Sequence, residues 1–215
     1  HIAGDRPDDV YRDLVTLLEQ SGDDMDVVVR YVGEVLGSVL DADRWLGVMQ
    51  RLADRLPDRP EVHLARSFVA HRAGQSGQAD ISLDRALELR PGWEEAAIFR
   101  LSWWNDAEKR EAIKAFAEKF LAAYPDRGRF QLVFARFLVQ WEDNSAALEQ
   151  FRHLVELEPE NSDALLAAGL LYLQEKQYQP AAEMLRRFLK LKPGADQARL
   201  YLARIAREEQ RHQAA

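Results

Sequence analysis

The segment Asn161–Pro193 decides the fold, and it reads NSDALLAAGLLYLQEKQYQPAAEMLRRFLKLKP. Apolar residues recur at helical spacing in its first half and again in its second half, and a short polar turn separates the halves. Gly169 and Ala181 are small enough for two helices to approach closely, while Tyr172 and Leu185 fill the space above and below. The segment therefore predicts a tightly packed helix pair that ends at a proline.

This unit recurs along the chain with a period of 34 residues. The period is marked by proline, at Pro57, Pro91, Pro125, Pro159 and Pro193. A fixed period in this range indicates a solenoid, in which each repeat buries its apolar face against its neighbours.

The pattern resembles the tetratricopeptide repeat, whose motif has small residues at positions eight and twenty, bulky ones at eleven and twenty-four, and proline at thirty-two. Counted from Ser162, these positions are Gly169, Ala181, Tyr172, Leu185 and Pro193. Counted from Gly128, they are Ala135, Ala147, Leu138, Phe151 and Pro159. Counted from Pro60, they are Ser67, Ala79, Ala70, Leu83 and Pro91. The resemblance implies an all-α fold, a right-handed superhelical solenoid of antiparallel helix pairs.

The register of the repeats predicts a single array over residues 7–215 with about 12 helices, preceded by a disordered lead at residues 1–6. Its parts are a half-repeat at 7–25, repeats at 26–59, 60–93, 94–127, 128–161 and 162–195, and a capping helix at 196–212. The half-repeat has the phase of a second helix whose first helix is absent, which predicts that the chain was cut from a longer one.

Composition excludes several classes of partner. The net charge of −7 is concentrated in the first 59 residues, with 13 acidic and 7 basic side chains, and no basic stripe appears elsewhere. Binding to nucleic acid or to anionic lipid needs clustered Lys and Arg, so neither is expected. The longest apolar run, Ala164–Leu173, is too short for a transmembrane segment, which needs about 20 residues. We expect a protein or peptide partner.

No catalytic residue, metal site or cofactor site is predicted, and the chain is not expected to be an enzyme. There is no glycine-rich phosphate loop, HExxH or GxSxG motif, and the absence of cysteine excludes thiolate zinc sites. His63 and His71 are eight residues apart on one expected helix, about 12 Å, which is too far to share a metal. Each histidine is expected to be solvated or to line a groove.

In tetratricopeptide arrays the first helix of each pair lines the concave face at positions two, five, nine, twelve and thirteen, here called the inner positions. The resemblance implies a protein-binding groove formed by Leu64, Phe68, His71, Arg72, Ile98, Arg129, Leu132, Arg136, Val139, Leu166, Leu170, Leu173 and Arg204, followed by Leu200 and Arg207. Arrays that clamp a peptide carboxylate place lysine at position five and asparagine at position nine, and this sequence has neither there. A chaperone-type carboxylate clamp is therefore not expected.

Two interpretations of this surface stay open. Apolar side chains interspersed with arginines favour a groove for an apolar, partly acidic polypeptide. Alternatively, tight curvature of the array lets Leu166, Leu170 and Leu173 pack against neighbouring helices. The tryptophans are expected to pack in the core, with interface anchoring as the alternative.

Three phrases look like one group of proteobacterial envelope lipoproteins: PEVHLARSFVAHRAG, RALELRPGWEEAAIFR and ARLYLARIAREEQR. The resemblance implies a periplasmic, outer-membrane-anchored adaptor that brings a carboxyl-terminal processing protease together with substrates such as cell-wall hydrolases. Without this resemblance, a cytoplasmic scaffold is expected. The alternative function is a structural module that forms homo-oligomers through exposed terminal faces.

Overall fold

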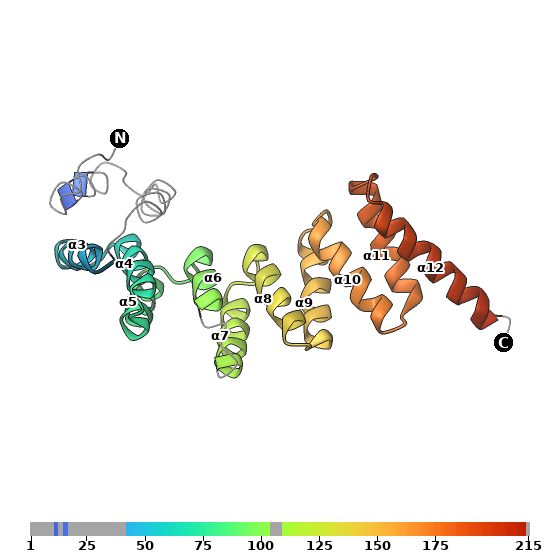
Figure 1. Ribbon diagram of the computed structural model, residues 1–215, viewed down its shortest axis with the longest axis horizontal. Helices are drawn as coiled ribbons and strands as arrows, with labels where there is room; N and C mark the ends of the chain where they lie inside the picture. The colour runs from blue at the N-terminus through green and yellow to red at the C-terminus, as the bar shows by residue number, and fades with distance from the viewer. Residues whose placement is uncertain (1–10, 13–14, 17–41, 104–108, 214–215) are drawn as a thin grey trace. The chain divides into compact units, whose positions relative to one another are not determined.

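The computed structural model describes residues 11–12, 15–16, 42–103 and 109–213, and this part of the chain contains helices and no strands. Ten helices are defined in it: α3 Ala42–Arg55, α4 Pro60–Arg72, α5 Ser76–Leu89, α6 Glu94–Trp103, α7 Arg110–Ala123, α8 Gly128–Gln140, α9 Asn144–Leu157, α10 Ser162–Gln174, α11 Tyr178–Leu191 and α12 Asp196–Gln213 (Figure 1). The all-α class is confirmed. The two further helices expected before α3 lie outside the described residues, except for helical fragments at 11–12 and 15–16.

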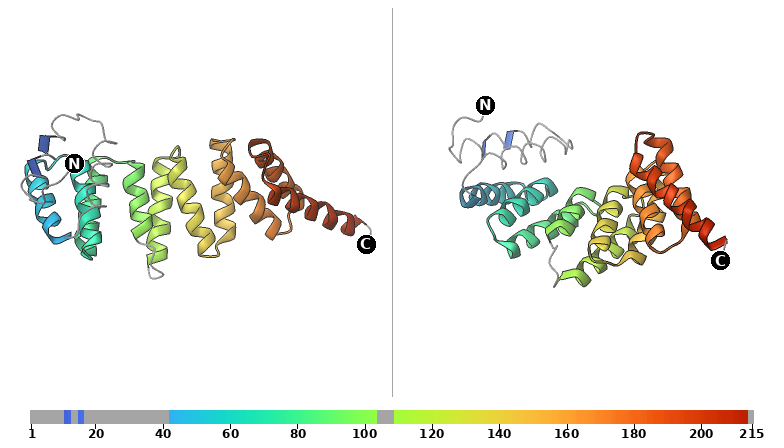
Figure 2. Two further views of the ribbon diagram at one scale, coloured as in Figure 1. Left: turned by 45° about the horizontal axis from the view of Figure 1, so that its top comes forward. Right: turned by 45° about the vertical axis from the view of Figure 1, so that its right-hand side comes forward.

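The helices fall into two compact units, residues 1–110 (unit 1) and residues 111–215 (unit 2). In unit 1, α4 packs against both α3 and α5, and α5 contacts α6. In unit 2, α8 packs with α9, α9 with α10, α10 with α11, and α11 with α12 (Figures 1 and 2). The helices in these contacts therefore pack mainly on their neighbours in sequence, as expected for stacked helix pairs. The boundary between the units falls inside the repeat expected at 94–127.

In three of the helix pairs, the turn between the helices has a residue with positive φ at the same repeat position, although the residue differs. Gly74, Glu142 and Lys176 occupy equivalent positions one period or more apart, with φ of 73°, 63° and 59°. In the last pair, Lys176 N–H donates to Leu173 O at 3.1 Å and Gln177 N–H donates to Tyr172 O at 2.8 Å. These two hydrogen bonds form a Schellman motif, which satisfies the last carbonyls of the first helix.

The periodic prolines end the second helix of each pair. Each lies two residues beyond a helix, and those helices end at Arg55, Leu89, Ala123, Leu157 and Leu191. Proline has no amide hydrogen and disfavours a helical conformation in the residue before it, so the helix stops. Asn161 then starts the next helix, because its side chain accepts a hydrogen bond from Ala164 N–H at 3.0 Å.

The core runs along each unit as a series of apolar clusters between helices. In unit 1, one cluster contains Trp45, Met49 and Leu52, and a second contains Leu64 and Trp93. Trp93 is thus a core residue, as expected. In unit 2, the largest fully buried side chains are Ile113, Phe130, Leu138, Phe151, Leu154, Leu165 and Leu185. These residues follow the helical periodicity of the sequence.

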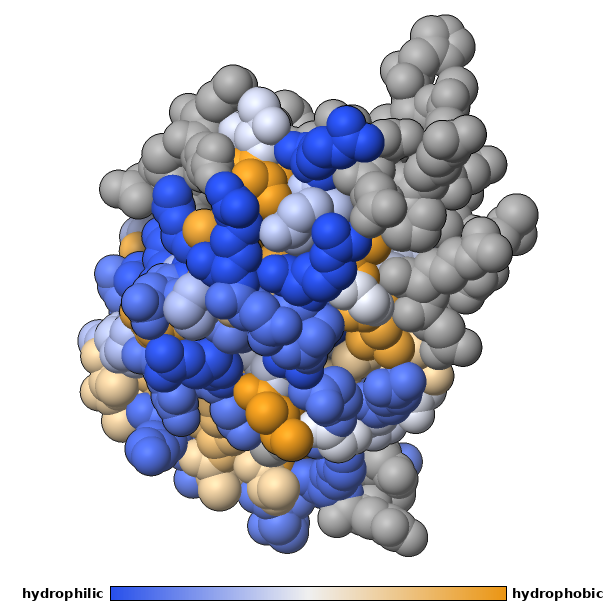
Figure 3. All heavy atoms as spheres, turned by 90° about the vertical axis from the view of Figure 1, so that its left-hand side faces the viewer, coloured by the Kyte–Doolittle hydropathy of each residue, from blue (hydrophilic) through white to orange (hydrophobic). Residues whose placement is uncertain are grey.

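The surface nearest α3 is mostly hydrophilic and is interrupted by small separate hydrophobic patches (Figure 3). Among the described residues, only Ile81, Val139, Leu157 and Leu200 are large hydrophobic side chains with high exposure. None of the described helices has the length and hydrophobicity that a membrane span requires.

Candidate protein-binding site

The site in unit 2 depends on close packing of α10 against α11. Gly169 of α10 is buried opposite Leu185 of α11, and a Cβ atom at residue 169 would lie 3.0 Å from Leu185 Cγ. This distance is shorter than an ordinary van der Waals contact, so the helices approach as closely as glycine allows. The close approach expected from the small residues is therefore present. It holds Phe188, on the same helix as Leu185, near the inner face of α10.

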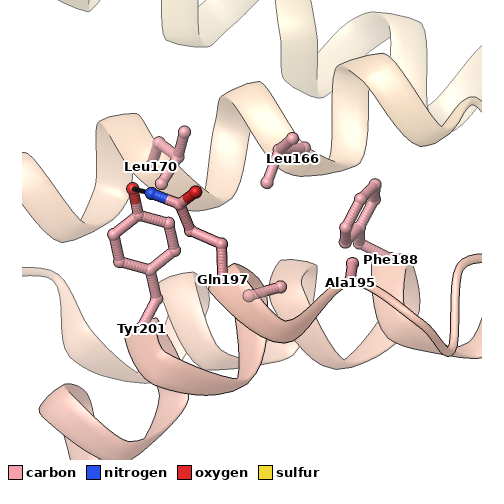
Figure 4. A pocket seen from close by; sticks show the side chains of 7 residues that line it. Leu166, Leu170, Phe188, Ala195, Gln197 and Tyr201 are labelled. Carbon is pink, nitrogen blue, oxygen red and sulfur yellow. Dashed lines mark hydrogen bonds between the residues drawn. The ribbon is translucent and has the colours of Figure 1, made fainter.

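An apolar pocket of about 260 Å³ opens between α10, α11 and the start of α12 (Figure 4). Its lining consists of Leu166, Leu170, Phe188, Ala195, Gln197, Ala198 and Tyr201. Leu166 and Leu170 form one wall, and in Figure 4 their side chains face those of Phe188 and Gln197. The structure therefore brings two of the predicted groove leucines together in one hollow.

One edge of this pocket is polar. Gln197 Nε2 donates a hydrogen bond to the Tyr201 hydroxyl at 3.2 Å, and both side chains lie beside Leu170 (Figure 4). The amide oxygen of Gln197 remains an acceptor and the tyrosine hydroxyl remains a donor for a further group. The pocket thus combines an apolar interior with a small hydrogen-bonding rim, which is the usual composition of a recognition pocket.

The same positions are filled in unit 1. Three periods of 34 residues relate Leu170 to Phe68, Ala195 to Trp93 and Tyr201 to Phe99. Trp93 is buried in the cluster that contains Leu64, and the rings of Phe68 and Phe99 lie 5.8 Å apart in an edge contact. In unit 1 the large Trp93 packs in one cluster with the small Ala86, whereas in unit 2 the equivalent positions hold the small Ala195 and the large Phe188. The pocket therefore accompanies an exchange of large and small residues at two repeat positions.

Exposed apolar and cationic side chains also lie on α8 and α12 of unit 2. Val139 of α8 is 39% exposed, and Leu200 of α12, next to Tyr201, is 69% exposed. Arg204 is exposed on α12 and shares a helix face with Gln197 and Tyr201, because residues three, four and seven apart are neighbours on a helix. Among the described residues, none forms an ion pair with Arg204.

The other predicted groove arginines of unit 2 are also exposed. Arg136 of α8 forms an ion pair with Asp163 of α10 at 2.6 Å, and both side chains are more than half exposed. Such an exposed pair contributes little to stability, about 0 to 1 kcal/mol. Arg129 is exposed as well. Leu132 and Leu173 are half-buried and do not line the pocket, so they match the packing interpretation better than Leu166 and Leu170 do.

In unit 1 the predicted residues form an aromatic cluster. Phe68 is half-buried against Phe99 and Trp103, and the exposed His71 ring stacks on Trp103 with centroids 4.5 Å apart. Arg72 is exposed and Ile98 is half-buried, so both are accessible in part.

Two residues differ from the expectations. Leu64 is 3% exposed, because Leu83, Trp93 and Ala96 pack around it, and its side chain is not available to a partner. His63 is buried and its Nε2 lies 2.8 Å from the Pro57 carbonyl oxygen. The expectation that His63 is solvated or lines a groove is therefore wrong.

Sequence reasoning missed several lining residues of the pocket: Phe188, Ala195, Gln197, Ala198 and Tyr201. Only Gln197 occupies an inner position of its repeat. A signal was nevertheless present, since comparing equivalent positions shows Ala195 where unit 1 has Trp93. Only the folded structure shows that these positions lie next to each other in space.

One ion pair of unit 2 joins a lysine of α7 to an aspartate at the start of α9. Lys114 Nζ lies 2.6 Å from Asp143 Oδ2. This ion pair connects α7 to α9, because Asp143 is the N-cap residue of α9. This hydrogen bond raises the pKa of Lys114 and lowers the pKa of Asp143. In the described part of the chain, no group of three or more His, Asp or Glu side chains is arranged to hold a metal ion.

The described helices thus define a helical-repeat protein built from antiparallel pairs, with an apolar pocket on one pair. Residues 162–194 match the family described as tetratricopeptide repeat, and this segment is such a repeat. No curated protein matches the sequence.

Solved structures of tetratricopeptide-repeat proteins share the fold. The structure of YrrB, described as a tetratricopeptide-repeat protein with an unusual peptide-binding site, is 17% identical with a TM-score of 0.54, covering 86% of this chain and 95% of that one. PilF of Pseudomonas aeruginosa is 14% identical with a TM-score of 0.61, covering 96% and 87%. MamA of Desulfovibrio magneticus RS-1 is 18% identical with a TM-score of 0.56, covering 81% and 98%. At these identities the likeness shows the fold alone.

Proposed function

We propose that this chain is a non-catalytic adaptor that binds a polypeptide segment on the inner face of unit 2. The observation that carries the proposal is the pocket beside Leu166 and Leu170, two inner positions of the repeat at 162–195. A pocket of about 260 Å³ is below the range of about 300–1,000 Å³ typical of small-molecule sites. Its size suits one large apolar side chain of a protein partner.

The fold supports a protein partner, since a tetratricopeptide-repeat fold is that of a protein-interaction scaffold. YrrB is described as having a peptide-binding site, which makes peptides the first ligands to test here. The more specific function implied by the sequence resemblance is delivery of cell-wall hydrolases or other substrates to a carboxyl-terminal processing protease in the envelope. The predicted groove residues of both units belong to this proposal, except the buried Leu64.

The test is capture of partners by the immobilised chain from a proteobacterial envelope extract, with identification by mass spectrometry. Leu170→Asp places a charge at the pocket and should abolish capture of the protease or of the hydrolases. Leu157→Asp is the matched control, because Leu157 is an exposed leucine of α9 that does not line the pocket. Equal capture by both variants would contradict a site at this pocket. Helicity measured by circular dichroism must be unchanged in both variants.

A second function, self-assembly, is favoured by a different surface of α12. Ala203 and Ala206 are exposed, whereas the equivalent residues of α10 are the buried Gly169 and the half-buried Tyr172. Those α10 residues face the second helix of their own pair, so α12 presents a face of the type that packs on another helix. Sedimentation velocity over a hundredfold range of concentration tests this function. A constant monomer would contradict it.

A further inference from the structure

We infer that the unit 2 pocket recognises an apolar side chain followed or preceded, about three residues away, by an acidic side chain that pairs with Arg204. The inference rests on the proposed function, because it names the kind of segment that the same site would bind. It adds a second contact point and a spacing between the two.

The pocket accepts one side chain only. Its walls are Leu166, Leu170 and Phe188, and the small Ala195 lines it at the repeat position that Trp93 holds in unit 1. A pocket of about 260 Å³ beside a buried phenylalanine suits a Phe, Leu or Trp side chain of the partner. Burial of such a side chain removes apolar surface from water, which makes it the anchor of the interaction.

Charge near the pocket favours an acidic partner. The carboxylates of α12 in the described structure already have partners. Asp196 pairs with Arg199, Glu208 with Arg211 and Arg207, and Glu209 accepts a hydrogen bond from Gln179. Arg204 is exposed in this row and has no ion pair among the residues described. The planar guanidinium of an exposed arginine can donate two parallel hydrogen bonds to one carboxylate.

The geometry of α12 gives the spacing. Ala198 lies in the middle of the pocket-lining part of α12, and Arg204 is six residues further along the helix. At 1.5 Å per residue this separation is about 9 Å. An extended peptide advances about 3.3 Å per residue, so a carboxylate about three residues from the anchor reaches the guanidinium. The direction of the peptide decides whether the acid precedes or follows the anchor.

Fluorescence anisotropy with the whole chain and synthetic peptides tests the inference. The probes are labelled nine-residue Ser/Gly peptides with a central Phe and with Glu, Gln or Lys three residues before or after it. In one of the two orientations, the Glu peptide should bind about twofold to fivefold more tightly than the Gln peptide, as expected for an exposed ion pair. This difference should shrink in 0.5 M salt, because salt screens exposed charges. A peptide without Phe should not bind.

Variants separate the two contact points. Arg204→Glu should reverse the preference from the Glu peptide to the Lys peptide, whereas Arg186→Glu, at an exposed arginine of α11 that does not line the pocket, should leave it unchanged. Ala195→Trp copies Trp93 and should close the pocket, so that all peptides bind at least tenfold more weakly. This variant adds apolar volume at an open position, and it tests the pocket without disturbing Leu166 or Leu170.

The outcomes distinguish the inference from the proposed function. If Glu and Gln peptides bind equally and Ala195→Trp abolishes both, the peptide site stands and the role of Arg204 is overturned. If no Phe peptide binds the unmodified chain, the proposed peptide site fails and the inference fails with it. If the chain instead forms a dimer that Ala195→Trp dissociates, a second copy occupies the pocket, and the inference is also overturned.

Discussion

Gly169 and Leu185 set the separation of α10 and α11, because a Cβ at residue 169 would lie 3.0 Å from Leu185 Cγ and 3.1 Å from its Cδ2. The pair therefore has no room for a larger residue on α10. Since Phe188 lies on the same helix as Leu185, this separation also positions one wall of the unit 2 pocket. The packing of α10 on α11 therefore also determines the shape of the candidate site.

Gly169→Phe should open this helix pair and lower the free energy of unfolding by about 1–3 kcal/mol or more, because the ring cannot fit without moving α11. Thermal melting followed by circular dichroism measures the change. Gly47→Phe is the matched control, since Gly47 is exposed on α3 and a Cβ at this residue would have no neighbouring atom within 4 Å. Its effect should stay within about 0.5 kcal/mol. Equal losses in the two variants would contradict the close approach of α10 and α11.

Lys176→Gly should stabilise the chain by about 0.5–1 kcal/mol. Lys176 has φ of 59°, a conformation that costs L-residues roughly 1–2 kcal/mol, while glycine adopts it readily at a smaller cost in the unfolded state. Gly74→Ala at the equivalent turn of unit 1 should have the opposite effect and destabilise by about 1 kcal/mol. Urea denaturation measures both. Lys176→Ala keeps the strained backbone without the charge, so a gain in that variant would show that the charge, not the backbone, is responsible.

Stability should depend on pH through Lys114 and Asp143. The hydrogen bond with Lys114 lowers the pKa of Asp143 in the folded state, so its contribution is present above the unfolded pKa of 3.8 and is lost as pH falls through the lower folded pKa. The same bond raises the pKa of Lys114, so that contribution is present below pH 10.5 and is lost as pH rises through the higher folded pKa.

Asp143→Asn isolates this ion pair, because asparagine still accepts the hydrogen bond from Ala146 N–H that caps α9. The side chains are 28% and 34% exposed, so the loss at pH 7 should be at most about 1 kcal/mol. Urea denaturation should show this difference from the unmodified chain at pH 7 and little difference at pH 2. A difference that is the same at both values would exclude the ion pair as its cause.

Leu83→Ala should destabilise unit 1 by about 2–5 kcal/mol, because Leu83 is fully buried between α5 and its neighbours and its loss leaves a cavity. Ile81→Ala on the same helix should change stability by no more than about 0.5 kcal/mol, since Ile81 is 64% exposed. Thermal melting compares the two. Similar losses would mean that α5 buries a different face.

Much of the local structure follows from residues close together in the sequence. The prolines predict the helix ends to within two residues, and Gly169 with Ala181 predicts the close pair, because helix ends and helix faces depend on short-range periodicity. A helix, α12 Asp196–Gln213, is present where the sequence predicts a capping helix at 196–212. The shared conformation of Gly74, Glu142 and Lys176 was less evident, since only the first of them is glycine.

The exposure of the groove residues was decided by tertiary structure. Leu64 and Leu166 occupy the same repeat position, yet Leu64 is covered by Trp93 while Leu166 lines a pocket beside Ala195. The sequence alone determines the direction in which each side chain points, because helical periodicity fixes that direction for every position of a repeat. Whether that side chain meets solvent or a neighbour depends on the volume of residues about 30 positions away, and only the packed structure brings those residues together.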